Sequence, residues 1–439
     1  MITKNEAEHL AHCLESVRDL VDEVVVVDTG STDGTVAIAE AFGARIGRFQ
    51  WCDDFSAARN ASLSLCTGDW VLSLDADEAI DSLDHRKIRQ VVDHPVGKGK
   101  QEPQGFVLLS RNYLMDSLSR VFDQQAQPNR TPYREGSQFP YYADIPIFRL
   151  FRRLPHIKFE GRIHERADTF LERRRLPIGR LDAVIHHYGK LDLEGERVKR
   201  AYYLELAERD AAEVPGDANR QFYVMAQAEL LQEWDKVLGA GLAVMKLQPG
   251  GGPPAVPLTV ANAYQQKGMH DKALPLLLQV VGNQPAHPQA VSGLAFSFLA
   301  LGRGEEARPY LERACAVHPI NPFIRITLCY LEEAAGRLRE ARAHLRASIE
   351  GNPRDLNLRQ ILIKLDLRHG LAAQAAADAM EALRALPGAG GGLWHALAAG
   401  FLLKEGHLGP GRAVLDLGLA SFPENADLRK LAAALPATP

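Results

Sequence analysis

The sequence predicts two domains of different class: an α/β domain with a mostly parallel sheet, followed by an all-α array of repeated helix pairs. Three observations support this division. Apolar runs of strand type alternate with amphipathic helical patterns up to about residue 195. Glycine, alanine and proline then recur at steps of 34 residues in the second half. A chain of 439 residues is also too long for one hydrophobic core.

The first domain opens with a helix and then a buried strand. Apolar residues from Leu10 to Val21 recur at the spacing of one helix face. The run of four valines at 24–27 is typical of a parallel strand that is covered on both faces. This strand ends at Asp28 in a glycine-rich turn, and residues 36–42 predict the next helix.

A second set of elements repeats this alternation. Residues 45–51 predict a short strand, a helix capped by Asp54 or Ser56 runs to about residue 65, and another strand starts at Trp70. Strands that alternate with helices imply right-handed crossovers and parallel pairing. Asp28 and the carboxylates after the Trp70 strand should therefore emerge at one edge, where such sheets bind ligands.

The strand from Trp70 ends in two carboxylates one residue apart, Asp75 and Asp77. Aspartate is unfavourable inside a core without a partner, so this pair is expected to hold a metal ion or a polar ligand. The alternative is a capped turn followed by an acidic helix start, because clustered carboxylates also suit a helix N-terminus.

Four blocks of the sequence occur in order: MITKNEAEHLAHCLESV, VVVVDTGSTDGT, DDFSAARNASL and GDWVLSLDADE. They resemble the successive blocks of the family 2 glycosyltransferases, which have the GT-A fold and use nucleotide-sugar donors. The segments RLFRRLPHIKFEGRIHE and VIHHYG resemble the later part of this domain in a subgroup fused to tetratricopeptide repeats. Residues 91–147 match no block of the family.

The chemistry of glycosyl transfer gives the acidic pair a role. Negative charge develops on phosphate oxygens as a nucleoside diphosphate leaves, and a hard divalent cation stabilises it. By resemblance to the family's DxD pattern, Asp77 should ligate Mn²⁺ or Mg²⁺ directly. Asp75 should contact the donor ribose, or the metal through water. Asp28 resembles the carboxylate that receives a hydrogen bond from the donor base; an Asx-turn role is its alternative, and both can hold together.

Three further residues are expected on the donor side. Lys4 and Glu6 follow the first strand, where the family passes beneath the base. Arg59 lies in a predicted helix, and its guanidinium suits phosphate or the Asp75 carboxylate. A surface or structural ion pair is the alternative for Arg59.

An inverting transfer also needs a base to accept the acceptor's proton. Glu165 resembles the family's base, with a surface loop carboxylate as its alternative. His164 is expected to position acceptor or phosphate, unless it is hydrogen-bonded within the domain. His187 resembles the late histidine that GT-A enzymes often supply to the metal, and a core histidine is the alternative.

The first strand is expected to be short. Family members normally have several more apolar residues before the segment that starts here at Met1. A shortened central strand loses backbone hydrogen bonds and part of the base-binding floor. We therefore expect this chain to be less stable or less active than an extended version.

The second half carries a tetratricopeptide signature. Three residue types keep a 34-residue step: Gly268, Gly302, Gly336 and Gly370; Ala273, Ala307, Ala341 and Ala375; Pro285, Pro319, Pro353 and Pro387. Stacked helix pairs of this kind form a superhelix with a concave surface. We expect repeats over residues 254–435, after a helical linker or degenerate repeat over residues 196–253. The array either binds the acceptor or a protein partner, self-associates, or only stabilises the catalytic domain.

Composition restricts partners and location. The formal net charge of −4 gives no global basic field, so nucleic acid is not expected as a partner. No stretch approaches the ~20 apolar residues that a bilayer span requires. The sequence therefore predicts a cytoplasmic protein, with peripheral attachment to a membrane as an option.

These observations predict a metal-dependent inverting glycosyltransferase with its GT-A domain at residues 1–195. The expected donor is a UDP-hexose, and the expected acceptor is a protein, a glycan or a lipid-linked sugar. The alternatives are a non-catalytic repeat scaffold that carries an inactive glycosyltransferase-like domain, and a nucleotidyltransferase. The sequence lacks an early glycine-rich loop that bears Lys or Arg for a triphosphate, which disfavours the nucleotidyltransferase.

Overall fold

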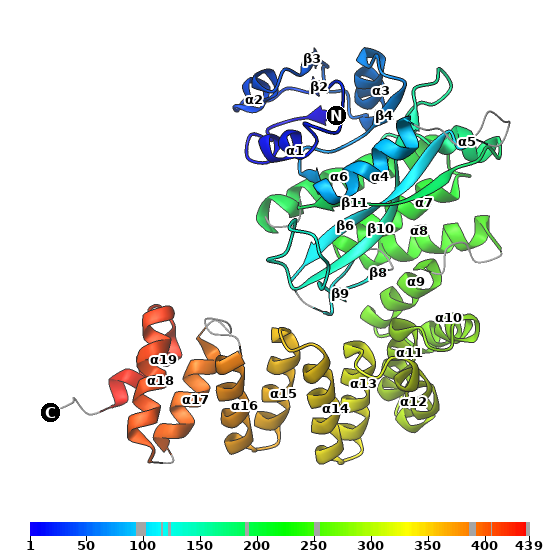
Figure 1. Cartoon of the computed structure of the whole chain (residues 1–439). Coiled ribbons are helices and arrows are strands. Elements are labelled where there is room, and N and C mark those ends of the chain that lie inside the picture. The colour runs from blue at the N-terminus through cyan, green and yellow to red at the C-terminus, as the bar shows by residue number, and fades with distance from the viewer. Residues whose placement is uncertain are drawn as a thin grey trace. The chain divides into compact units, whose positions relative to one another are not determined.

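The computed structural model describes residues 1–93, 102–115, 117–121, 124–188, 193–249, 255–385, 392–404 and 406–435. The chain divides into two compact units, which Figure 1 colours from blue to red along the sequence. Unit 1 comprises Met1–Leu114 and Ser119–Lys267, and unit 2 comprises Met115–Leu118 and Gly268–Pro439. Unit 1 holds the β-sheets, and unit 2 holds the repeated helix pairs.

Unit 1 begins with a three-stranded parallel sheet in the order β1–β2–β3. Its strands and the accompanying helices are β1 (Ile2–Thr3), α1 (Leu10–Ser16), β2 (Val25–Asp28), α2 (Thr35–Ala41), β3 (Arg45–Arg48) and α3 (Phe55–Leu65). All of β2 is buried, as its valine run predicts. Asp54 caps α3, and its carboxylate accepts a hydrogen bond from the Ala57 N–H at 2.9 Å. The parallel alternation predicted from the sequence is therefore confirmed here.

A second sheet has mixed strand directions. Its main strands, in spatial order, are β4 (Trp70–Leu72), β10 (Tyr141–Arg152), β6 (Gly105–Leu114), β11 (Gly179–His187) and β5 (Glu78–Ile80). The strand β10 runs antiparallel to β4 and β6, whereas β6 and β11 are parallel. This sheet is less parallel than the sequence suggested, because β6 and the start of β10 come from residues 91–147, which match no block of the family.

Smaller elements surround this sheet. They are α4 (Ser82–Asp93), β7 (Arg120–Val121), β8 (Gln124–Gln125), β9 (Gln127–Pro128) and α5 (Thr169–Arg173). On one face, Leu20 and Ile88 pack against Ile185 of β11. Another apolar cluster joins Phe148 and Phe151 of β10 to Leu171 of α5. These contacts fix the strand ends that carry the polar residues.

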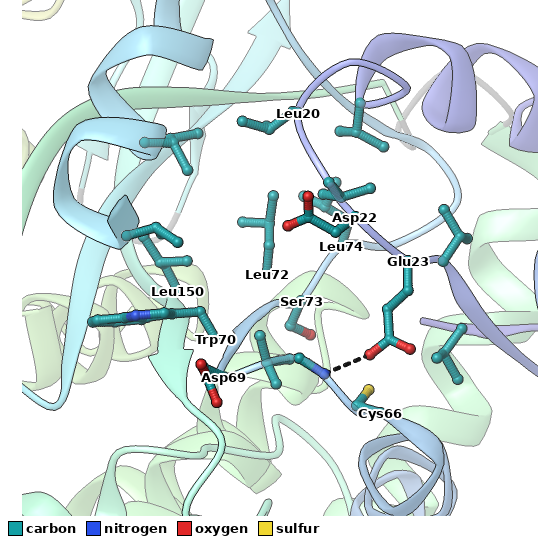
Figure 2. Close-up of a pocket in the computed structure, with 18 of the residues that line it drawn as sticks. Leu20, Asp22, Glu23, Cys66, Asp69, Trp70, Leu72, Ser73, Leu74 and Leu150 are labelled. Carbon is teal, nitrogen blue, oxygen red and sulfur yellow. Dashed lines mark hydrogen bonds between the residues drawn. The ribbon is translucent and has the colours of Figure 1, made fainter. Parts of the chain in front are cut away.

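A cavity of about 510 Å³, lined by both apolar and charged residues, lies between β2 and β4 (Figure 2). Leu72 and Leu74 are among its lining residues. The Met1 amino group lines it too and donates to the Val25 carbonyl oxygen at 2.8 Å. Among the described residues, the two-residue strand β1 pairs with β2 and with no other strand. That the first strand is shortened relative to the family stays a prediction.

Four helices complete unit 1: α6 (Leu193–Glu213), α7 (Ala218–Leu230), α8 (Trp234–Leu247) and α9 (Ala255–Gln266). Each packs against the next in sequence. The first three cover the region predicted as a linker or degenerate repeat, whereas α9 lies within residues 254–435, which were predicted as repeats. All four belong to the same compact unit as the sheets.

Unit 2 is built of helix pairs. Its helices are α10 (His270–Asn283), α11 (Pro288–Ala300), η1 (Gly304–Ala307), α12 (Arg308–Val317), α13 (Pro322–Ala334), α14 (Leu338–Gly351), α15 (Leu356–Arg368), α16 (Ala372–Ala385), α17 (Leu393–Lys404), α18 (Leu408–Ser421) and α19 (Ala426–Ala434). No helix in the described part of the chain combines the length and apolar character that crossing a membrane requires.

The 34-residue period marks the turns and crossings of these pairs. The four glycines of the period have φ between +71° and +75°, the conformation that ends one helix before the next begins. The four alanines are almost fully buried. His287, Asn321 and Asp355 keep the same step and cap the helices that follow them. The repeat prediction is confirmed, although Pro387 lies outside the described residues.

Candidate functional site

A cavity of about 750 Å³ in unit 1 brings together nearly all the residues predicted for the site. Those that line it are Lys4, Glu6, Arg59, Asp75, Asp77, His164, Glu165 and His187. They come from segments up to 183 positions apart: the ends of β1, β4 and β11, the helix α3, and the segment between β10 and α5. Asp28 is not among the lining residues; its neighbour Thr29 takes that place.

Asp28 organises the turn that follows β2. Its Oδ2 accepts a hydrogen bond from the Gly30 N–H, and its Oδ1 accepts one from the Ser31 N–H, both at 3.1 Å. The structure therefore shows the Asx-turn role that the sequence left open. Its contact with a donor base stays a prediction.

The turn after β1 is tied to the turn after β2. The Asn5 side-chain oxygen accepts from the Thr32 N–H at 2.8 Å, and the Glu6 N–H donates to Thr35 Oγ1 at 2.7 Å. Asn5 has φ of +57°, a conformation that asparagine tolerates better than most residues. These contacts hold Lys4 and Glu6 at the wall of the cavity.

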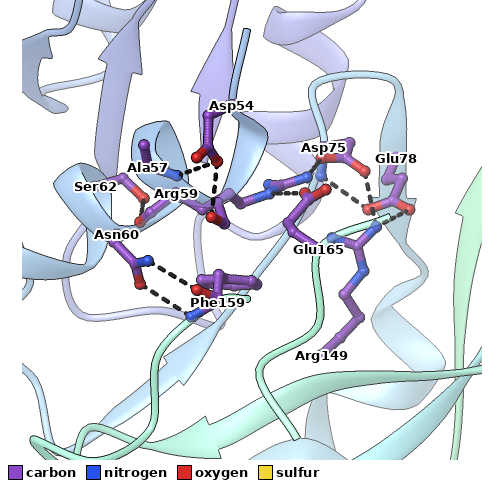
Figure 3. A network of polar contacts seen from close by, with 11 residues as sticks. Asp54, Ala57, Arg59, Asn60, Ser62, Asp75, Glu78, Arg149, Phe159 and Glu165 are labelled. Carbon is purple, nitrogen blue, oxygen red and sulfur yellow. Dashed lines mark hydrogen bonds and ion pairs between the residues drawn. The ribbon is translucent and has the colours of Figure 1, made fainter. Parts of the chain in front are cut away.

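Ion pairs join two arginines to three carboxylates beneath the cavity (Figure 3). Arg59 donates from Nε to Glu165 Oε1 at 2.7 Å and pairs through Nη2 with Asp75. Arg149 donates from Nη2 to Asp75 Oδ2 at 2.7 Å and to Glu78 Oε1 at 3.1 Å. The Asp75 carboxylate therefore lies between two guanidinium groups, and Glu165 is joined to it through Arg59.

This arrangement sets the charge of the acidic groups. Burial would raise the pKa of Asp75, but the charges of Arg149 and Arg59 outweigh it and hold that pKa below its usual value. Burial raises the pKa of Glu78, against the opposing charge of Arg149. Asp75 is thus ionised and held in place by ion pairs at neutral pH. The sequence analysis missed Arg149, although it opens the RLFRRL block as a charged residue in an apolar strand.

Asp77 and His187 lie next to each other in the wall of the cavity. Asp77 Oδ2 is 3.3 Å from His187 Nε2. The Tyr188 N–H donates to the Asp77 carbonyl at 3.1 Å, so the end of β11 is fixed beside the acidic turn. Burial would lower the pKa of His187, but the hydrogen bond and charge of Asp77 raise it above its usual value.

A divalent cation fits between these two side chains. Two ligands at right angles, each ~2.1 Å from a cation, are ~3 Å apart, close to the separation of Asp77 Oδ2 and His187 Nε2. In the part of the chain that the structure describes, no cluster of three or more His, Cys, Asp or Glu side chains is placed to hold a metal. The protein would therefore supply two ligands and leave the other positions to phosphate and water, as Mg²⁺ commonly requires.

The charge balance agrees with that fit. The carboxylates of Asp75, Glu78 and Glu165 pair with the two guanidinium groups of Arg59 and Arg149, and a fourth carboxylate, from Asp77, lies beside His187. With His187 neutral, this inner set carries an excess of two negative charges. One divalent cation would neutralise it.

His164 is engaged by α7. Its ring stacks on Tyr223 with the ring centroids 4.5 Å apart, and its Nε2 lies 2.8 Å from the Gln227 side-chain nitrogen. Burial lowers the pKa of His164, so the ring is neutral at pH 7. The alternative of a histidine hydrogen-bonded within the domain is therefore realised, and a role towards acceptor or phosphate stays a prediction.

Aromatic side chains form the opposite wall of the cavity. The Trp51 indole N–H donates to Tyr202 Oη at 2.8 Å, and Phe55 makes edge-on contacts with Trp51 and Tyr203. Tyr202, Tyr203 and Lys199 come from α6. Sequence reasoning did not assign them to the site because they follow the boundary at residue 195. The adjacent tyrosines in the sequence were the available signal.

The fold and the site define an α/β domain whose acidic centre is held by arginines. Residues 1–96 match the family model described as Glycosyl transferase family 2. An uncharacterized glycosyltransferase of Rickettsia felis is 48% identical over 80 residues, which cover 18% of this chain and 28% of that protein. The N-terminal part of the chain is therefore a glycosyltransferase family 2 domain, which confirms the recognition from sequence motifs.

Two further relatives extend the likeness. A TPR repeat-containing protein of Synechococcus elongatus is 38% identical over 195 residues, 43% of this chain and 41% of the relative. The SPbeta prophage-derived glycosyltransferase SunS of Bacillus subtilis is 29% identical over 167 residues, 38% of this chain and 33% of the relative. This chain spans less than half the length of each of these curated relatives.

Solved structures of tetratricopeptide proteins resemble the chain at a low level. A tetratricopeptide repeat protein from Parabacteroides merdae has a TM-score of 0.39 and 15% identity, with 54% of this chain and 92% of that chain covered.

Proposed function

We propose that this chain is an inverting glycosyltransferase that takes a sugar from a nucleotide-sugar donor with the help of Mn²⁺ or Mg²⁺. The observation that carries the proposal is the convergence of Asp77, His187 and the Asp75–Arg59–Glu165 network on one cavity of a family 2 glycosyltransferase domain. A UDP-hexose is the proposed donor. The proposed acceptor is a protein, a glycan or a lipid-linked sugar.

The donor side is assigned to the acidic turn and its surroundings. Asp77 and His187 would hold the cation, which when bound stabilises negative charge on the departing diphosphate. Asp75, kept ionised by two arginines, would contact the ribose or the water shell of the cation. Lys4, Glu6 and Asp28 would lie about the base. Hydrogen bonds and ion pairs fix the side chains of Asp28, Asp75 and His187 in advance, so these groups need little reorganisation when the donor binds.

The acceptor side is assigned to Glu165 and the aromatic wall. Glu165 would take the acceptor's proton as the acceptor attacks the anomeric carbon from the face opposite the leaving group. Its hydrogen bond from Arg59 holds the carboxylate in a fixed orientation beside Asp75. His164 would position the acceptor. Aromatic rings such as Tyr203 present apolar faces that suit the carbon-bound hydrogens of a sugar.

A survey of nucleotide sugars tests this proposal. Purified full-length protein is incubated with each donor and Mn²⁺, and release of the nucleoside diphosphate is measured with and without EDTA. We expect release with at least one donor, loss of release with EDTA, and at least a hundredfold decrease in Asp77→Asn, on the order of the loss of one key electrostatic group.

The matched control is Asp22→Asn, which changes an exposed carboxylate that pairs with Arg89 and does not line the cavity of the site. It should retain full activity. Absence of release with every donor would refute the proposal as a whole. Release that is unaffected by EDTA and by Asp77→Asn would refute its metal component.

A further inference from the structure

One buried amide contacts the proposed metal-binding histidine. Asn112 lies on β6, directly beside His187 of β11 in the parallel register of these strands. Its side chain is buried, with a relative exposure of 6%. The distance from its Oδ1 to His187 Nδ1 is 2.9 Å. This amide therefore contacts the ring nitrogen that points away from Asp77.

The orientation of the amide is fixed by a second contact. Asn112 Nδ2 lies 3.2 Å from the Ser110 carbonyl oxygen. A carbonyl oxygen accepts hydrogen bonds and cannot donate, so the amide nitrogen must face Ser110 and the amide oxygen must face His187. An amide oxygen also only accepts. The hydrogen bond to His187 therefore requires a proton on Nδ1 of the imidazole.

This requirement decides which nitrogen is free to bind a cation. When the neutral ring carries its proton on Nδ1, the lone pair is on Nε2. Nε2 is the atom that lies 3.3 Å from Asp77 Oδ2. The other tautomer would place a hydrogen between His187 and Asp77, where a cation should bind. A hydrogen bond at the second ring nitrogen is the usual way that proteins orient a metal-ligating histidine.

We infer that Asn112 is a positioning residue that fixes the tautomer and the ring orientation of His187 so that Nε2 and Asp77 can bind a divalent cation together. The inference rests on the proposed function only in assuming that a cation binds at Asp77. It assigns no role to Asn112 in contacting donor or acceptor.

Cation binding without turnover tests the inference. Full-length protein is mixed with UDP and Mn²⁺, and free Mn²⁺ is measured by electron paramagnetic resonance. In Asn112→Leu, we expect Mn²⁺ affinity to fall about 10- to 100-fold, as for loss of other partners of metal ligands. Asn112→Asp keeps an acceptor oxygen for Nδ1 but loses the donor to the Ser110 carbonyl, so it should bind Mn²⁺ more tightly than Asn112→Leu. Equal Mn²⁺ affinity in Asn112→Leu and the unchanged protein would overturn the inference.

A second measurement does not depend on the folding of any Asn112 variant. Histidine labelled with ¹⁵N shows which ring nitrogens carry protons in the unchanged protein without metal and with UDP and diamagnetic Mg²⁺, and the His187 signals are identified by their absence in His187→Gln. We expect Nδ1 to keep its proton in both states and Nε2 to be unprotonated when Mg²⁺ is bound; a His187 ring without a proton on Nδ1 in the presence of Mg²⁺ would overturn the inference. Protein that binds Mn²⁺ at Asp77 with this tautomer but releases no nucleoside diphosphate would refute the proposed function and leave the role of Asn112 standing.

Discussion

Lowering the pH from 7.5 to 5 should destabilise unit 1 through one buried side chain, His186. This residue lies in β11 and is fully buried. Its Nδ1 is 2.6 Å from Tyr113 Oη, whereas its buried Nε2 has no hydrogen-bond partner among the described residues. Protonation would place a second N–H, and a charge, in surroundings that offer no acceptor for it.

The size of the effect follows from the pKa shift. Burial is the main cause that lowers the pKa of His186 from 6.5 to about 4. Smaller contributions come from nearby charges: Arg111 lowers this pKa further, and Glu135, Asp81 and Asp84 raise it. The unfolded chain therefore binds the proton more readily, so stability is complete above pH 6.5 and decreases as the pH falls towards 4. Between pH 7.5 and pH 5, linkage gives a loss of about 2 kcal/mol in the free energy of unfolding.

The comparison variant is His186→Asn, whose amide keeps a polar group near Tyr113 but does not titrate. Urea unfolding of both proteins at pH 7.5 and pH 5 is followed by fluorescence, since Trp51, Trp70 and Trp234 all lie in unit 1. Relative to the variant, the unchanged protein should lose about 2 kcal/mol between the two pH values. The same pH dependence in both proteins would show that His186 is not the cause.

Three further changes test other parts of the structure. Arg59→Met leaves Glu165 without its arginine and Asp75 with Arg149 alone, and should reduce the free energy of unfolding by about 3 kcal/mol. Arg18→Met, which breaks an exposed pair, should change it by less than about 1 kcal/mol in urea unfolding. Burial raises the pKa of Asp366 to about 6, so the folded protein loses stability as the pH rises from about 4 to about 6. In thermal melts over this range, the Tm of the unchanged protein should fall relative to that of Asp366→Asn. A constant difference in Tm between the two proteins would contradict this. Gly336 has φ of +75°, so Gly336→Ala should destabilise unit 2 by about 1 kcal/mol. Gly282 lies inside α10 with free space around it, so Gly282→Ala should stabilise unit 2 by about the same amount. Effects of the same sign in the two variants would argue against the turn geometry at Gly336.

Local patterns were sufficient to predict the parts of the structure that short segments specify. The valine run before Asp28 indicated a buried parallel strand, and the 34-residue step indicated the glycine turns of unit 2. The position of the acidic pair at a binding edge was predictable for the same reason, because the pair directly follows β4 in the sequence. The roles of Asp75, Asp77, Glu165 and His187 in binding or catalysis stay predictions.

Residues that depend on distant pairing were not predictable. Asn112 and Arg149 each lie in a long strand, and their partners lie on or next to other strands. Tyr202 meets Trp51 from 151 positions away. A helical pattern shows that residues 193–213 form a helix, but it does not show which cavity that helix lines. Long-range partners of this kind follow from tertiary packing and leave no periodic signal in one sequence.

The place of α6 has a practical consequence for work on the isolated catalytic domain. A fragment that stopped at residue 195 would keep Asp77 and His187 but would lose Tyr202, Tyr203 and Lys199. Such a fragment would expose Phe55 to water and leave the Trp51 indole without its tyrosine partner. If such a fragment were inactive, the missing side of the cavity would be a sufficient cause. The activity of the acidic centre should therefore be measured on protein that contains the whole of α6.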